Sequence, residues 1–260
     1  RFGDAGKVAA ECDVTVAVLG INKSIEREGQ DRFSLELPVD QQEFIKELYK
    51  VNPNTVVVLV AGSSMAVNWM DENVPAILNA WYPGEQGGNA VAEVLFGDYN
   101  PGGRLPLTYY NSLDEIPAFD NYSVKGRTYQ YFEGQPLYEF GCGLSYTKFR
   151  YKSKGVNVEQ DTVKVSFEVS NTGKYDGDEV AQVYVKYPET GTYMPLKQLH
   201  GFKRVHIKKG KTSKVTIGVP KKDLRYWDEQ ERKFVTPKGE YTFMVGASSE
   251  DIKFRETVGL

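Results

Sequence analysis

The sequence predicts an α/β unit built on a partial, mostly parallel sheet, followed by an all-β antiparallel sandwich. Two unbroken apolar runs, Val14–Leu19 and Thr55–Ala61, suit parallel strands that are covered on both faces, with an apolar stripe at helical spacing between them. From Lys152 onward, apolar and polar residues alternate in short segments that Gly and Asn turns separate. We therefore expect two domains of different class in this 260-residue chain.

The first half reads as a βαβ unit with a right-handed crossover. Lys7–Cys12 has helical composition, and Asp40 with Glu43 resembles a capping box that opens a helix ending before Pro53. Further elements are expected at residues 76–81 (strand), 89–96 (helix) and 104–108 (short edge strand). Because a parallel sheet needs more strands than these, we expect the sheet to be truncated, with its missing part upstream of Arg1.

A segment rich in aromatic residues connects the two halves, and we place the domains at residues 1–112, 113–150 and 151–260. Large rings gain free energy mainly by burial, so this segment is expected to pack over another surface instead of acting as a flexible linker. In the last domain, strands are expected around residues 163–169, 183–185, 215–217 and 241–245. That domain carries no convergent polar cluster and is predicted to be structural.

Charge is distributed unevenly along the chain. Residues 151–260 hold 20 Lys and Arg against 15 Asp and Glu, a balance of +5, which leaves 12 against 20, or −8, for residues 1–150 and gives the total of −3. An acidic first half disfavours polyanionic substrates, so no nucleic-acid partner is expected. No apolar run reaches the roughly 20 residues that span a bilayer, so no membrane partner is expected either.

Several chemistries are disfavoured by what the sequence lacks. The only cysteines, Cys12 and Cys142, form neither a disulfide framework nor a zinc site, and they leave the redox compartment unreadable. The only histidines, His200 and His206, fall on predicted sandwich strands, which removes a Ser-His-Asp arrangement from the α/β half. The segment from Gly62 to Ala66 follows a strand but lacks the second glycine of a nucleophile elbow.

The strongest functional signal is the long stretch after the first strand, from Gly20 to Pro38. Ligands of open α/β sheets bind outside the carboxyl ends of the strands, and this connection exceeds the roughly 2–6 residues usual there. It carries Glu26, Glu28 and Asp31 among cationic residues, so burial can protonate one carboxylate while cations keep the others ionised. Paired roles of this kind are typical of acid–base catalysis.

Three motifs occur in order along the chain: the loop Gly20–Arg32 with Leu37-Pro38, the stretch Ala80–Gly88, and the stretch Gly97–Thr108. Together they resemble the second domain of glycoside hydrolase family 3, of the β-xylosidase or β-glucosidase type. The segment Tyr138–Thr147 is similar to the family's passage into a fibronectin type III-like domain, and Ser170–Gly173 and Leu199–Phe202 resemble signatures of that domain. The resemblance implies an α/β three-layer sandwich followed by a fibronectin type III-like sandwich.

The resemblance also implies a mechanism. Members of the family are retaining exo-β-glycosidases in which an N-terminal barrel supplies the nucleophile and the α/β sandwich supplies the general acid/base; no cofactor or metal is implied. The family pattern places the acid/base at Glu26, with Glu28 as the rival position. Asp31 and Arg32 are expected to structure the loop by an ion pair, with Arg27 and Arg32 turned to Glu28 and Asp31 and away from Glu26.

The segment Lys125–Tyr129 resembles β-xylosidase-like members more than β-glucosidases, so β-xylosides are the favoured substrates and β-glucosides the next. The implied partners are a β-linked oligosaccharide and an N-terminal barrel, either a domain or a second chain of the same enzyme. A homo-oligomer and a secreted or periplasmic location are further expectations. The alternative hypothesis is a non-catalytic carbohydrate-binding or scaffolding protein of the same family.

Overall fold

The computed structural model describes residues 2–191 and 193–260 and divides the chain into two compact units. The first unit holds the residues up to Phe96 together with Tyr109–Ala118 and Gly134–Leu137; the second holds Gly97–Thr108, Phe119–Glu133 and Tyr138–Leu260. The chain therefore passes between the units more than once. The domain boundaries at residues 112 and 150 stay predictions.

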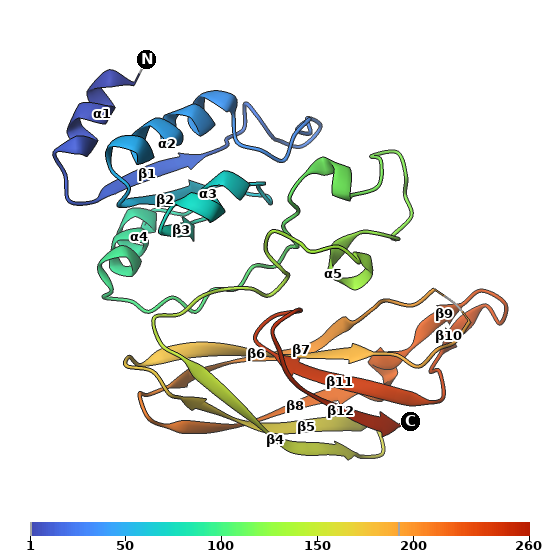
Figure 1. Ribbon diagram of the computed structural model, residues 1–260. Helices are drawn as coiled ribbons and strands as arrows, with labels where there is room; N and C mark the ends of the chain where they lie inside the picture. The colour runs from blue at the N-terminus through green and yellow to red at the C-terminus, as the bar shows by residue number, and fades with distance from the viewer. Residues whose placement is uncertain (1, 192) are drawn as a thin grey trace. The chain divides into compact units, whose positions relative to one another are not determined.

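The first unit is a parallel sheet with helices on both of its faces (Figure 1). Its strands are β1 (Thr15–Gly20), β2 (Thr55–Val60) and β3 (Ala76–Asn79), hydrogen-bonded in that order and all parallel. Its helices are α1 (Gly3–Ala10), α2 (Val39–Val51), α3 (Asn68–Asn73) and α4 (Gly87–Phe96). Figure 1 shows α1 and α2 on one face and α4 on the other, which confirms the three-layer α/β prediction.

Strand β2 lies at the centre of this sheet, and its apolar run is buried as predicted. Strand β1 lies at an edge, and the prediction that both of its faces are covered is wrong. Ala17 and Leu19 are buried, whereas Val16 and Val18 on the opposite face are exposed. Successive side chains of a strand point to opposite faces, so a continuous apolar run cannot by itself distinguish a covered face from an open one.

Three local predictions for the first half need correction. The capping box is wrong, because α2 begins after Pro38 without a side-chain cap and Asp40 lies inside its first turn. The edge strand at residues 104–108 is absent: Leu105 exchanges single backbone hydrogen bonds with Gly141 and Cys142, and Pro106 has no N–H with which to extend a ladder. Helix α3 was not foreseen.

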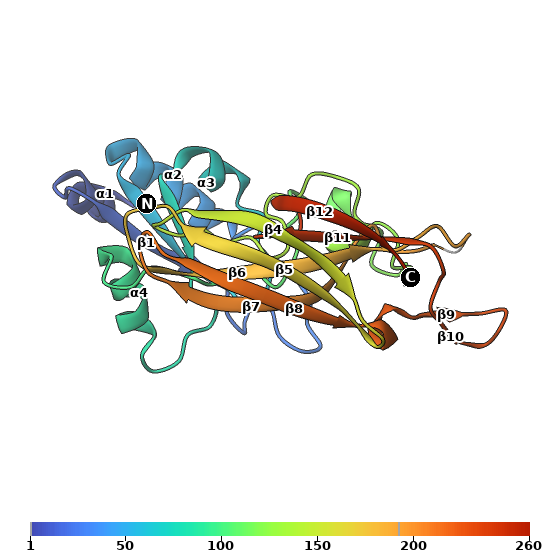
Figure 2. The same ribbon diagram turned by 90° about the horizontal axis from the view of Figure 1, so that it is seen from below.

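The second unit is an all-β sandwich, as the resemblance implied. One sheet has the order β12-β11-β6-β7, the other has the order β4-β5-β8, and β9 and β10 form a separate hairpin. The strands are β4 (Phe149–Val158), β5 (Thr162–Asn171), β6 (Gly177–Lys186), β7 (Gln198–Ile207), β8 (Thr212–Pro220), β9 (Tyr226–Asp228), β10 (Lys233–Val235), β11 (Glu240–Gly246) and β12 (Ile252–Gly259). Figure 2, which shows the protein from below, looks onto a face of this sandwich, with its long strands running across the view.

Alternation along these strands builds the core of the sandwich. Every second residue of β5 is buried, from Val163 to Val169, and Val215 and Ile217 of β8 and Phe243 of β11 join the same cluster. Successive side chains of a strand point to opposite faces, so the polar residues between the buried ones lie on the outer face, and the strand pairs within each sheet are antiparallel. The predicted antiparallel sandwich is therefore confirmed.

The aromatic segment packs partly within the second unit. It contains η1 (Leu113–Glu115) and α5 (Thr128–Tyr131). The ring of Tyr129 stacks on Phe140 with centroids 4.2 Å apart and meets Tyr184 of β6 edge-on. Phe119 and Tyr122 are exposed, so the expectation that this segment packs over another surface holds for only part of it.

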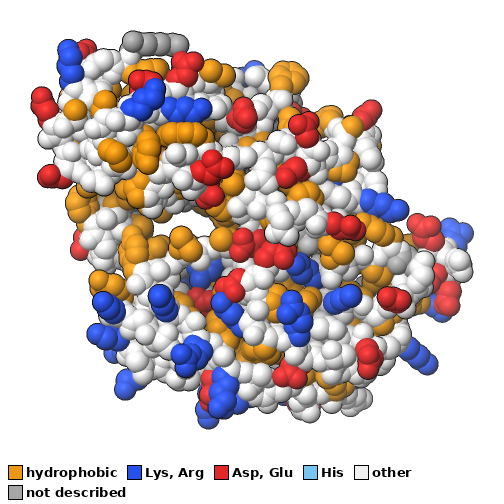
Figure 3. All heavy atoms as spheres, viewed as in Figure 1, with side chains coloured by type: hydrophobic (Ala, Val, Ile, Leu, Met, Phe, Trp, Pro, Cys, Tyr) orange, Lys and Arg blue, Asp and Glu red, His pale blue; other side chains and the backbone are white. Residues whose placement is uncertain are grey.

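Charged side chains are dispersed over the sandwich. On the face drawn in Figure 3, Lys and Arg side chains are spread over the sandwich, and Asp and Glu side chains lie mainly toward its centre and right. The run of lysines near residue 209 lies at an exposed turn between β7 and β8, as the sequence predicted. Within the described residues, no helix is both long enough and apolar enough to cross a membrane.

One histidine of β7 makes the stability of the sandwich depend on pH. Burial lowers the pKa of His200, and its Nε2 lies 2.8 Å from the hydroxyl of Tyr187. In the unfolded chain, His200 binds a proton with its ordinary pKa of 6.5. The contribution of the buried, neutral His200 to stability is therefore fully present above that pH. It is lost as the pH falls from there toward the lower folded-state value.

We therefore expect the urea midpoint of the wild-type protein to decrease when the pH is lowered from about 7.5 to about 5. The midpoint of His200→Gln should decrease less over the same range. His206→Gln, which removes the more exposed histidine of the same strand, serves as the control and should retain the loss that arises from His200. Equal slopes for wild type and His200→Gln would contradict the assignment.

Candidate active site

Three loops follow the three parallel strands and meet at one edge of the sheet, where the strands end. They span residues 21–38 after β1, 61–67 after β2 and 80–86 after β3. All three belong to the first unit. The carboxyl edge of an open parallel sheet is the usual place for a ligand site, so the side chains of these loops form the candidate site.

The base of the β1 loop is held by a reciprocal amide contact. The Gly20 N–H donates to Gln41 Oε1 and Gln41 Nε2 donates to the Gly20 carbonyl, both at 2.8 Å. Residue 20 must be glycine, because a Cβ there would lie 1.8 Å from the Val60 carbonyl oxygen of the neighbouring strand. Beyond it, Asn22 closes a turn by accepting the N–H groups of Ile25 and Glu26.

The carboxylate of Glu26 is bound from two sides. Its Oε2 accepts a hydrogen bond from Arg32 Nε at 2.5 Å and another from the Ser63 hydroxyl at 2.8 Å. The expectation that Arg32 turns away from Glu26 to pair with Asp31 is therefore wrong. Arg32 points inward because three of the four acceptors for its other nitrogens lie on the β2 loop, which sequence spacing does not reveal.

Every guanidinium nitrogen of Arg32 has an acceptor, and the side chain is only 9% exposed. Nη1 donates to the Leu35 carbonyl at 3.3 Å and to Met65 Sδ at 3.1 Å, and Nη2 donates to Ser63 Oγ at 3.0 Å and the Ser64 carbonyl at 2.9 Å. A guanidinium is planar and rigid, so these bonds fix the β1 loop against the β2 loop. Ser63 closes the network by bonding both Arg32 and Glu26.

Glu28 lies outside this network. Its side chain is exposed, and within the described residues no hydrogen bond or ion pair engages its carboxylate. The expectation that Arg27 pairs with Glu28 is wrong: Arg27 Nη1 donates to the Lys23 carbonyl at 3.1 Å, and its backbone pairs with Gln30. Asp31 is likewise exposed. The loop therefore holds the Glu26 carboxylate fixed and presents two others, Glu28 and Asp31, to solvent.

The loops after β2 and β3 contribute residues that sequence reasoning did not assign to the site. Ser63 was considered only as part of a failed nucleophile elbow, and the ring of Tyr82 packs directly on Gly62. The signal that could have found both is their position, since each follows a parallel strand at the same edge as the carboxylate loop.

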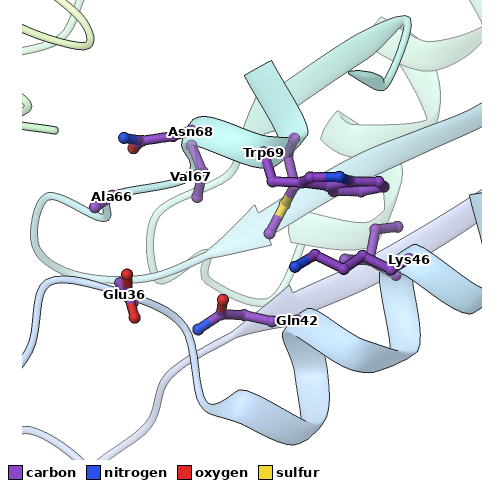
Figure 4. A pocket seen from close by; sticks show the side chains of 9 residues that line it. Glu36, Gln42, Lys46, Ala66, Val67, Asn68 and Trp69 are labelled. Carbon is purple, nitrogen blue, oxygen red and sulfur yellow. The ribbon is translucent and has the colours of Figure 1, made fainter. Parts of the chain in front are cut away.

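A separate pocket of about 210 Å³ lies between α2 and α3 (Figure 4). Glu36, Gln42 and Lys46 face Asn68 and Trp69 across it, and Lys46 Nζ lies 5.6 Å from the centroid of the Trp69 ring. Gln42 donates to the Leu37 carbonyl at 2.7 Å, which occupies its amide. Among the described residues, no group of three or more His, Cys, Asp or Glu side chains could hold a metal ion, here or elsewhere.

Comparison with known families decides the identity of this arrangement. The family described as Glycosyl hydrolase family 3 C-terminal domain matches residues 1–146, more than half of the chain. The chain belongs to glycoside hydrolase family 3. A fibronectin type III-like domain matches residues 179–249, within the second unit. The carboxylate loop and its Arg32 network thus lie inside the family 3 C-terminal domain.

Relatives in the family carry names from two activities. A xylan 1,4-beta-xylosidase from Xylanibacter ruminicola is 42% identical over 86% of this chain and 26% of its own length. A beta-xylosidase from Formosa agariphila is 38% identical over 97% of this chain and 36% of its own length. The crystal structure of a beta-glucosidase from Kluyveromyces marxianus in complex with glucose matches with a TM-score of 0.92 at 35% identity. This chain covers 33% of the protein in that crystal structure, and it thus spans about a quarter to a third of the length of these relatives.

Proposed function

We propose that this chain is the C-terminal part of a retaining exo-β-glycosidase that releases sugars from non-reducing ends, with β-xylosides favoured over β-glucosides. The observation that carries the proposal is the carboxylate loop at the carboxyl edge of the sheet, clamped through Arg32 so that a second carboxylate stays free. Family membership supports the glycosidase class, and the two relatives named as xylosidases support the substrate preference.

The proposed reaction divides two carboxylates between two parts of the enzyme. This chain supplies the general acid/base, and an N-terminal barrel, as a domain or as a separate chain, supplies the nucleophile. In a retaining glycosidase the two carboxyl groups stand about 5–5.5 Å apart, and the acid protonates the leaving oxygen while the nucleophile attacks the sugar. Water then attacks the glycosyl-enzyme intermediate while the same residue, now a base, accepts a proton from that water.

Within the loop, we assign the acid/base role to Glu28 in place of Glu26, which the family pattern favoured. An acid must present an O–H to the glycosidic oxygen, within hydrogen-bond reach of it. Glu26 Oε2 accepts hydrogen bonds from both Arg32 and Ser63, and protonation of this carboxylate would remove the negative charge that pairs with the buried Arg32. Glu28 has a free carboxylate on the same clamped loop, and Glu26 then serves as the anion that holds Arg32 in place.

The proposed location is secreted or periplasmic. A relative from Salmonella typhimurium that is 34% identical over 96% of this chain is named a periplasmic beta-glucosidase, which supports export.

The test of the proposed function compares this chain alone with the chain joined to its nucleophile-bearing domain. Alone, the 260-residue chain should not hydrolyse p-nitrophenyl β-xyloside, because an acid without its nucleophile cannot form the glycosyl-enzyme intermediate. Joined, it should turn over xylobiose faster than cellobiose. Turnover by the isolated chain at the rate of whole enzymes would refute the division of roles, and an inactive joined protein that only binds oligosaccharide would favour the carbohydrate-binding alternative.

A further inference from the structure

The ring of Tyr82, in the loop after β3, lies against the backbone of the loop after β2. A Cβ built on Gly62 would come 2.5 Å from Cε2 and 3.0 Å from Cδ2 of this ring, so the contact exists only because residue 62 is glycine. The Tyr82 side chain is nevertheless 53% exposed. One part of the ring is therefore supported by backbone while the rest is open.

The residue before it adopts a strained backbone conformation. Trp81 has a φ of 55°, in the left-handed region that a bulky residue rarely occupies. Its N–H donates weakly to Asn79 Oδ1 at 3.4 Å, and Asn79 Nδ2 in turn donates to the hydroxyl of Tyr109 at 3.0 Å. Strain of this kind persists only where the surroundings enforce it and is concentrated at ligand-binding sites. Here the strained residue directly precedes Tyr82, whose ring packs against the loop after β2.

This ring adjoins the carboxylate network. Gly62, which supports it, is followed directly by Ser63, whose hydroxyl donates to Glu26 at 2.8 Å and accepts from Arg32 at 3.0 Å. Tyr82 thus places a half-exposed aromatic ring on the β2 loop, next in the chain to the serine that bonds Glu26 of the carboxylate loop. An aromatic side chain offers an apolar face of low conformational entropy, and such faces suit the C–H face of a pyranose ring.

We propose that Tyr82 is a specificity-determining residue that packs against the leaving-group sugar of the β-linked substrate; this rests on the proposed function. The acid/base acts on the oxygen that joins the two sugars, so the sugar that departs with this oxygen lies next to the acid's loop. The aromatic face beside that loop therefore meets the leaving group, and the sugar that forms the covalent intermediate lies toward the nucleophile.

The experiment uses the whole enzyme, that is, this chain with its nucleophile-bearing domain, and two substrates that share one glycone. The leaving group of xylobiose is a sugar, whereas the leaving group of β-xylosyl fluoride is a fluoride ion, which has no ring face that could pack on Tyr82. Tyr82→Ala should lower kcat/KM about tenfold for xylobiose, a loss typical of one apolar contact, and leave the fluoride unchanged. Tyr82→Phe should retain the wild-type value on both, because it keeps the ring.

Two further variants separate position from fold. Gly62→Ala, whose Cβ must displace the Tyr82 ring, should reproduce the selective loss on xylobiose. Tyr175→Ala, which removes a tyrosine of similar exposure (59%) from a turn of the sandwich, should change neither substrate.

An equal loss on both substrates in Tyr82→Ala would show a structural role and overturn the proposal, as would wild-type values on both. Failure of the proposed function is recognised separately, because Glu26→Ala and Glu28→Ala would then both leave xylobiose turnover intact whatever Tyr82→Ala does.

Discussion

Replacing Glu28 with alanine in the whole enzyme is expected to lower turnover of xylobiose by roughly 10²–10⁴-fold, the usual contribution of general acid–base catalysis. A sugar is a poor leaving group and departs only when its oxygen receives a proton. The Glu28 carboxylate is exposed in this unit and has no partner among the described residues, so it is free to approach that oxygen. The measurement is kcat on xylobiose for the variant and the wild type.

An activated leaving group makes the same variant diagnostic. Dinitrophenyl β-xyloside needs little protonation, so glycosylation of the Glu28→Ala enzyme should proceed while the intermediate accumulates without its base. Azide attacks such an intermediate without base assistance, and its addition should restore turnover with formation of the glycosyl azide. Rescue of this kind does not follow from a loosened fold, and it therefore distinguishes a lost catalytic carboxylate from a lost structure.

Glu26→Ala provides the matched comparison in the same loop. It removes the anion that pairs with Arg32 at 2.5 Å and leaves a buried guanidinium without its charge partner, so the loop should loosen and azide should not rescue the loss. Glu26→Gln keeps a hydrogen-bond acceptor for Arg32 and Ser63 and should lose less than Glu26→Ala. Azide rescue confined to the Glu26 variant would return the acid/base role to Glu26, and disaccharide activity in both alanine variants would exclude this loop.

The second large effect is expected for Glu179→Ala in the sandwich unit. Glu179 pairs with Arg104 at 2.8 Å, and the two side chains are only 3% and 9% exposed. Glu179 also accepts the hydroxyl of Tyr151 at 2.6 Å, and burial, followed by this carboxylate, raises the pKa of that tyrosine. Removing the anion leaves a buried cation unpaired, a change that costs about 3–5 kcal/mol and lowers Tm by roughly 10 °C or more.

Thermal unfolding followed by circular dichroism measures this effect, and the chain offers an exposed pair as control. Lys164 and Glu159 are 2.8 Å apart but largely in solvent, so Glu159→Ala should cost less than about 1 kcal/mol. The double variant Arg104→Met with Glu179→Leu should recover part of the loss, because no buried charge is left unpaired. A Glu179→Ala protein as stable as Glu159→Ala would show that the ion pair between Arg104 and Glu179 contributes little to stability.

Local pattern predicted most of the secondary structure of this chain. The apolar runs became β1 and β2, the helical stripe between them became α2, and the alternating segments became strands of the sandwich. These predictions succeed because strand and helix periodicity follow from the backbone geometry of neighbouring residues. Local pattern failed where a distant partner decides the outcome, as at Leu105, which makes single backbone bonds to a segment more than 30 residues away.

The two fold classes, the position of the carboxylate loop at the carboxyl edge of a parallel sheet, and the resemblance to glycoside hydrolase family 3 were all predictable from the sequence. The partners of these side chains became apparent from the folded structure. Arg32 turns to Glu26, Ser63 closes the network from 37 residues along the chain, and Tyr82 rests on Gly62. Charges near one another in sequence suggest many pairings, and the one that forms depends on which loops the strand order brings together.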